Sequence, residues 1–96
     1  MSKLVRDNII EIIKRKGENA KNHTATNQEY RIKLLEKLKE EINEFINEPN
    51  KEEIADVQEV IHAIIKEYDM NEQEIEEIRI KKHKERGGFD KKIILD

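Results

Sequence analysis

The chain has 96 residues, of which 43% are charged and 35% are hydrophobic. This length suits a single small domain over residues 1–96, and the low apolar content predicts a thin core that a homodimer or higher homo-oligomer would complete. The formal net charge of −3 argues against nucleic acid as a partner, and the lack of cysteine excludes disulfides and a cysteine-based zinc site or nucleophile.

The chain carries no signal for a membrane. No apolar run is long enough to span a bilayer, and the first residues do not follow the pattern of a signal peptide. The sequence also shows no internal repeat, linker or low-complexity segment. We therefore expect a cytoplasmic protein with no membrane partner.

The N-terminal part predicts one helix followed by a loop. Isoleucines recur at helical spacing over residues 3–16, and Gly17 supplies a stop. Residues 17–27 lack periodicity and are rich in small polar residues, which predicts a loop. The pattern alone assigns the charges of Lys3, Arg6 and Asp7 to the surface.

The middle of the chain predicts an αα-hairpin. Apolar residues recur at helical spacing over residues 28–48 and again over residues 51–69. The Glu48–Pro49–Asn50 turn separates the two arms, because proline disfavours the helical conformation in the residue before it. We expect the arms to lie antiparallel.

A fourth helix is predicted from Asn71 to Arg86. Asn71 is suited to cap it, with Glu74 at the third helical position, and Gly87 and Gly88 end it. The apolar tail over residues 89–96 predicts either a short strand or an extended arm. The fold class is therefore all-α, with four helices of which the middle two form a central hairpin.

Each arm of the hairpin carries two acids with i, i+3 spacing, which places both on one side of a helix. The pairs are Glu41 with Glu44, and Glu53 with Asp56. Both border apolar stripes, and carboxylates buried without partners are costly. Clustered hard oxygen ligands with open positions are what Mg²⁺ prefers, so we predict that the four acids bind Mg²⁺, with Mn²⁺ able to substitute. Glu40 or one of these ligands is a candidate general base for a metal-activated water.

The acidic pairs and a nearby histidine also admit two alternatives to a magnesium site. With 22 acidic residues in the chain, such spacings also arise by chance on charged helices. The Glu59–His62 pair has the Glu-x-x-His spacing of di-iron bundles, but those need it on two helices and here it occurs once. We reject a di-iron centre and expect a solvated His62, as we do for His23 in the loop.

Four segments in order give the chain a resemblance to a known family: KLVRDNIIEII, KLKEEINEF, EEIADVQEVI and KHKERGGF. This sequence resembles the MazG-like all-α nucleotide pyrophosphohydrolases, most of all their phosphoribosyl-ATP pyrophosphohydrolase-like subgroup. The resemblance implies a dimer, or a larger assembly, that cleaves a nucleoside triphosphate between its α and β phosphates with Mg²⁺.

The resemblance also implies roles for individual residues. The acids of the two pairs match the metal ligands, and Glu40 matches an acid that positions or activates water. Lys82 and Arg86, beside the glycine pair, become candidates for phosphate contact together with Lys37. The N-terminal Lys3, Arg6 and Asp7 match a recurrent pattern with a structural or substrate-side role.

The nucleotide itself stays open. Residues 17–27 contain no identifiable signature for base recognition, so the substrate can be a non-canonical or damaged nucleotide, or dCTP or dUTP. Removal of non-canonical or excess nucleotides is the leading expectation. Phosphoribosyl-ATP hydrolysis in histidine synthesis is an alternative. A non-catalytic helical adaptor, whose acids only keep a dimer in solution, is another.

Overall fold

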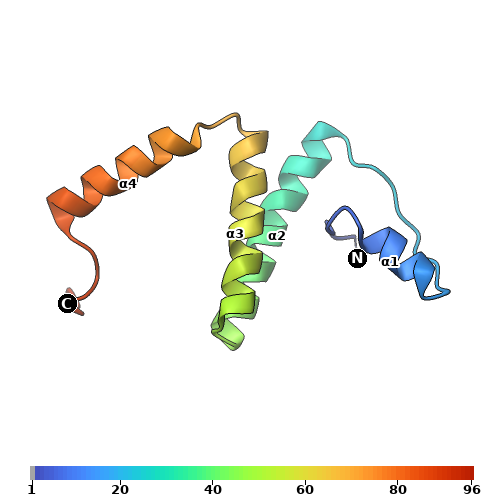
Figure 1. The fold of residues 1–96 in the computed structure, drawn as a ribbon, viewed down its shortest axis with the longest axis horizontal. Helices are drawn as coiled ribbons and strands as arrows, with labels where there is room; N and C mark the ends of the chain where they lie inside the picture. The colour runs from blue at the N-terminus through green and yellow to red at the C-terminus, as the bar shows by residue number, and fades with distance from the viewer. Residues whose placement is uncertain (1) are drawn as a thin grey trace. The chain divides into compact units, whose positions relative to one another are not determined.

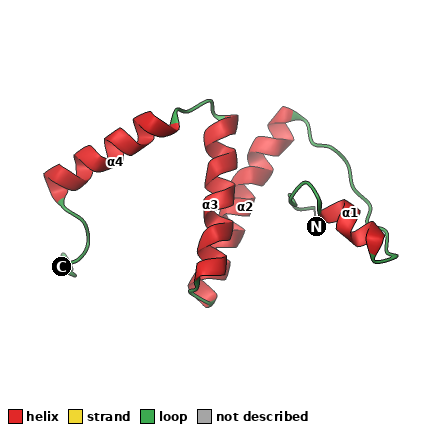
Figure 2. Ribbon diagram, viewed as in Figure 1, coloured by secondary structure: helices red, strands yellow, loops and turns green. Residues whose placement is uncertain are grey.

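The computed structural model describes residues 2–96, which form four α-helices and no strand (Figures 1 and 2). The helices are α1 (Ile9–Arg15), α2 (Asn27–Asn47), α3 (Lys51–Glu67) and α4 (Glu72–Arg86). The all-α prediction is thus confirmed. Within these residues no helix combines the length and the apolar character that a membrane span requires.

The described chain divides into two compact units, one that runs to Ile64 and one from Ile65 to Asp96. The first holds α1, α2 and most of α3, and the second holds α4 and the C-terminal residues. The prediction of one domain stays a prediction.

Helix α1 is shorter than predicted. The chain is not helical before Asn8, so the expectation of a helix from residue 3 is wrong for its first turns. No side-chain hydrogen bond caps the start of α1, and β-branched Val5 does not favour helix. Side chains of this segment instead reach acids of the hairpin. The predicted stop is confirmed, because Gly17 has φ +82°, a region that glycine adopts readily.

The predicted hairpin is confirmed, with α2 and α3 lying side by side (Figure 1). Thr26 Oγ1 accepts a hydrogen bond from the Glu29 backbone N–H at 3.2 Å and caps α2. The helix ends at Asn47, just before Pro49, as the proline predicts. Asn50 Oδ1 then accepts from the Glu53 N–H at 3.0 Å, which begins α3 and sets the position of Glu53 in its first turn.

The core of the hairpin is small. Leu34 on α2 is 1% exposed and Val60 on α3 is 8% exposed, whereas Ile46, Ile54 and Ile61 remain exposed. A chain of this size buries little apolar surface by itself. Several apolar side chains of the hairpin therefore remain exposed to solvent.

The second unit is built on α4, which begins as predicted. Asn71 Oδ1 accepts from the Glu74 N–H at 3.0 Å, and Gly87, with φ +81°, ends the helix. The tail contains a turn near Phe89 and no strand, so the strand alternative is wrong, and the residues after the turn have no regular secondary structure (Figure 2). Phe89 and Leu95 are each 96% exposed, and within the described unit the apolar tail remains uncovered.

Candidate metal centre

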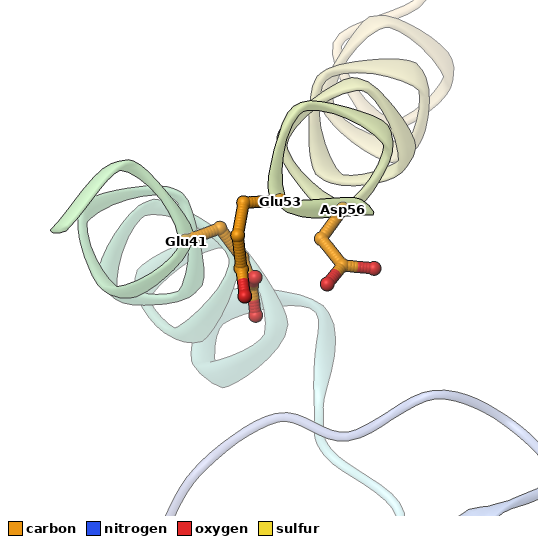
Figure 3. A group of neighbouring side chains, drawn as sticks. All are labelled: Glu41, Glu53 and Asp56. Atoms are coloured by element: carbon orange, nitrogen blue, oxygen red, sulfur yellow. The ribbon is translucent and has the colours of Figure 1, made fainter. Parts of the chain in front are cut away.

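Three of the four predicted ligands come together between the arms of the hairpin. Glu41 from α2 and Glu53 and Asp56 from α3 each offer a carboxylate oxygen, and these oxygens lie within 4.8 Å of one another (Figure 3). Their side chains point toward one another because antiparallel arms bring the end of α2 opposite the first turns of α3. Glu41, Glu53 and Asp56 are called the acidic triad below.

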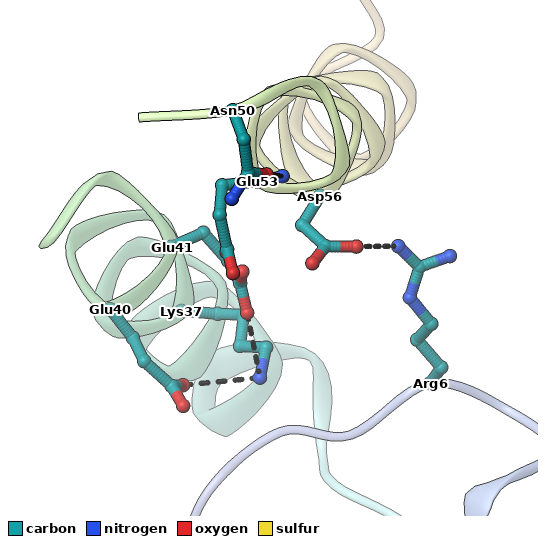
Figure 4. Close-up of polar contacts among 7 residues, drawn as sticks. All are labelled: Arg6, Lys37, Glu40, Glu41, Asn50, Glu53 and Asp56. Carbon is teal, nitrogen blue, oxygen red and sulfur yellow. Dashed lines mark hydrogen bonds and ion pairs between the residues drawn. The ribbon is translucent and has the colours of Figure 1, made fainter. Parts of the chain in front are cut away.

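Glu41 is the most enclosed acid of the triad, with its side chain 12% exposed. Burial of a carboxylate requires a partner, and Lys37 lies one turn earlier on α2. Its Nζ is 3.3 Å from Glu41 Oε1 and 3.1 Å from Glu40 Oε2, and its own side chain is 17% exposed. One lysine is therefore engaged by two adjacent carboxylates (Figure 4).

The pKa values of Lys37 and Glu40 reflect this contact. Burial alone would lower the pKa of Lys37, but hydrogen bonds and charge attraction from Glu40 and Glu41 outweigh it and raise that pKa. The hydrogen bond from Lys37 in turn lowers the pKa of Glu40, against a smaller opposing effect of burial and with help from the charges of Lys37 and Lys3. Lys37 thus stays protonated and Glu40 stays ionised at neutral pH.

The N-terminal segment supplies two further cations. Arg6 Nη2 donates to Asp56 Oδ1 at 2.8 Å, and Lys3 Nζ lies 3.5 Å from Glu40 Oε1. Arg6 and Asp56 are 50 positions apart in the sequence, so helical spacing cannot reveal this pair. The pattern at Lys3, Arg6 and Asp7 was the only sequence signal for these contacts, and it did not identify their partners.

Glu53 differs from the other two acids of the triad. Among residues 2–96 it is the triad member without a cation within ion-pairing distance. Partial burial raises its pKa, and the negative charges of Asp56, Glu44, Glu41 and Glu48 raise it further. The triad therefore carries negative charge that the chain's own cations leave incompletely neutralised.

This raised pKa predicts how stability depends on pH in the metal-free protein. The pKa of Glu53 is higher in the folded than in the unfolded state, so its ionisation opposes folding. The penalty is absent below the ordinary value of 4.5 and grows as the pH rises through the folded-state pKa. In EDTA, Glu53→Gln should therefore be more stable than wild type at pH 7, and this advantage should disappear near pH 4.

Urea unfolding at the two pH values measures this difference, with Glu52→Gln as the control. Glu52 is exposed, lies in the same turn and is outside the triad. Equal stabilities of Glu53→Gln and wild type at pH 7 would show that the charges of the triad do not repel one another appreciably.

The remaining predicted site residues lie outside the acidic triad. Glu44 is exposed and not part of it, although its charge contributes to the raised pKa of Glu53. Its role as the fourth ligand stays a prediction. Lys82 and Arg86 lie on α4 in the second unit, so their predicted contact with phosphate also stays a prediction.

The two histidines singled out in the sequence are both exposed. His62 is on the surface of α3, as expected. His23 is also exposed, but its Nε2 lies 2.9 Å from Glu29 Oε1, a contact that the sequence did not predict.

A cavity of about 760 Å³ lies in the same unit, between the N-terminal segment, α1, the following loop and the start of α2. Its apolar lining includes Ile9 and Tyr30, and its polar lining includes Asn22 and Asn27. Lys3 lines the cavity and also pairs with Glu40, which shares Lys37 with Glu41 of the acidic triad. The cavity therefore adjoins these charged residues at Lys3.

Comparison of the chain with protein-family models, curated proteins and solved structures finds no match. The resemblance of the sequence motifs to the MazG-like family therefore stays a prediction.

Proposed function

We propose that the protein is a Mg²⁺-dependent nucleotide pyrophosphohydrolase, a hydrolase that cleaves a nucleoside triphosphate into a monophosphate and pyrophosphate. The observation that carries the proposal is the acidic triad, in which three carboxylates from two helices converge within 4.8 Å. Burial and the negative charges of neighbouring acids raise the pKa of Glu53, and a bound cation would offset both effects.

The donor set fits magnesium. It consists of carboxylate oxygens alone, and Mg²⁺ commonly takes one or two carboxylates while retaining waters and binding substrate phosphates. Glu41, Glu53 and Asp56 would hold the ion, with Glu44 as the predicted fourth ligand. When bound, the ion would clamp phosphate oxygens, stabilise charge on the leaving group and lower the pKa of a water.

The neighbouring residues have separable roles in this proposal. Lys37 remains charged and holds the Glu41 carboxylate in place at 3.3 Å. Glu40 is tied to Lys37 and has a lowered pKa, which makes it a weak base. Of the two roles expected for Glu40, positioning is therefore favoured over activation of water.

The cavity beside Lys3 is the proposed site for the nucleoside part of the substrate. Its volume of about 760 Å³ falls within the range usual for small-molecule sites, and its lining combines apolar side chains with amides and with charged groups that include Lys21, Glu29 and Lys33. A nucleotide that places its phosphates at the acidic triad would extend past Lys3 into this space.

The test is a panel of canonical, deoxy and oxidised nucleoside triphosphates incubated with Mg²⁺, with release of pyrophosphate as the readout. Release above background for at least one nucleotide is expected, and its identity reports the base preference. No release for any nucleotide would refute the proposed activity. Restored growth of a histidine auxotroph would instead favour phosphoribosyl-ATP as the substrate.

We further propose that a second copy of the chain completes the core. Ile46 on α2 and Ile54 and Ile61 on α3 are exposed although they belong to the apolar stripes of the hairpin. Burial of such side chains stabilises by roughly 1.5–3 kcal/mol each, which favours association. Sedimentation equilibrium should therefore give a multiple of the 11.5 kDa chain mass, and a mass equal to one chain would contradict the proposed dimer.

A further inference from the structure

The N-terminal segment, residues 2–8, makes three polar contacts with the hairpin, one of which joins Arg6 to Asp56 of the acidic triad (Figure 4). The contacts are Lys33 Nζ to Ser2 O at 3.1 Å, Lys3 Nζ to Glu40 Oε1 at 3.5 Å, and Arg6 Nη2 to Asp56 Oδ1 at 2.8 Å. The last two contacts bring positive charge from the start of the chain to acids in its middle.

The Arg6–Asp56 contact leaves the guanidinium available to a ligand. The contact joins one guanidinium nitrogen to one carboxylate oxygen, whereas arginine has five N–H donors in a planar fork. The other oxygen of Asp56 faces the remaining acids of the triad (Figure 4). Arg6 is 56% exposed, so it can contact a ligand without giving up Asp56.

Lys37 is less suited to the same task. Its side chain is 17% exposed and its ammonium group already contacts Glu40 and Glu41. Three carboxylates repel a polyphosphate, so its binding requires a cation on the exposed side of the site. That cation must keep N–H donors free after it has paired with an acid. Of these two residues, Arg6 meets that need.

We propose that Arg6 is a phosphate-binding residue of this site, held beside the acidic triad by Asp56 so that its guanidinium contacts a phosphate oxygen of a metal-bound polyphosphate. This inference rests on the proposed function and narrows the structural or substrate-side role expected for Arg6 to contact with a phosphate. It also gives the N-terminal segment a role in substrate recognition.

The test uses the full-length protein, Mg²⁺ and inorganic pyrophosphate, the product expected from the proposed reaction. Calorimetry should show at least about tenfold weaker binding of pyrophosphate by Arg6→Gln, since a hydrogen bond to a charged group is lost. Arg6→Lys should show an intermediate loss, because it keeps the charge but not the fork. Arg15→Gln is the matched control, because Arg15 also pairs with an acid, Glu11, but lies outside the site.

A second measurement separates phosphate binding from a purely structural role. If Arg6 binds phosphate, Arg6→Gln should keep the Mg²⁺-induced rise in melting temperature while losing affinity for pyrophosphate. Loss of both responses would mean that Arg6 only orients Asp56, and retention of full pyrophosphate affinity would likewise overturn the proposal. Pyrophosphate binding needs no catalysis, so a failure to hydrolyse any nucleotide would refute the proposed activity without deciding the role of Arg6.

Discussion

The Glu41→Gln variant should release pyrophosphate at least about 100-fold more slowly than the wild-type protein, because removal of one group that stabilises developing charge costs about 10²–10³ in rate. Glu41 is the most enclosed acid of the triad and the one that α2 contributes to it. Glutamine has the same shape but no charge, so the change removes a metal ligand with little loss of packing. The measurement is the initial rate of release from the nucleotide that wild type hydrolyses best.

Glu36→Gln is the control for this experiment. Glu36 is also on α2 and also pairs with a lysine, Lys33 at 3.2 Å, but it is exposed and lies outside the triad. Its rate should stay close to that of wild type. If Glu41→Gln releases pyrophosphate as fast as wild type, the acidic triad does not take part in the hydrolysis.

Magnesium should raise the melting temperature of the wild-type protein by roughly 5–10 °C at ten times its dissociation constant. A ligand that binds only the folded state at this excess adds about 1.4 kcal/mol to the free energy of unfolding. In a domain of this size each kcal/mol corresponds to about 4–8 °C. Attraction between the ion and the carboxylates would supply the binding energy, and the ion's charge would offset the burial and repulsion that raise the pKa of Glu53.

Asp56→Asn should lose most of this response, while Glu59→Gln should keep it. Glu59 lies on the same helix, is exposed and does not belong to the triad. Sodium chloride at matched ionic strength controls for screening of surface charge. A wild-type protein that does not respond to Mg²⁺ would favour the non-catalytic helical adaptor, in which the acids are ordinary surface charges.

Much of the fold could be predicted because its signals are local. The ends of the hairpin arms follow from Pro49 and from the periodicity of apolar residues around it, and the start of α4 follows from Asn71 with Glu74 three residues later. The predicted helix over residues 3–8 is wrong because this segment makes contacts with distant parts of the chain. Residues 3–8 continue the apolar spacing of α1, yet Lys3 and Arg6 of this segment pair with residues far along the chain.

By itself, the sequence determined that the chain is all-helical and that acids gather on the hairpin, since caps, turn residues and i, i+3 spacings act within a few residues of one another. Only the tertiary structure decided which acids meet. It joined Glu41 to Glu53 and Asp56, left Glu44 outside the triad, and brought Arg6 across 50 positions to Asp56. Those contacts depend on how antiparallel helices face each other and on where the N-terminal segment meets them, and no local spacing encodes either.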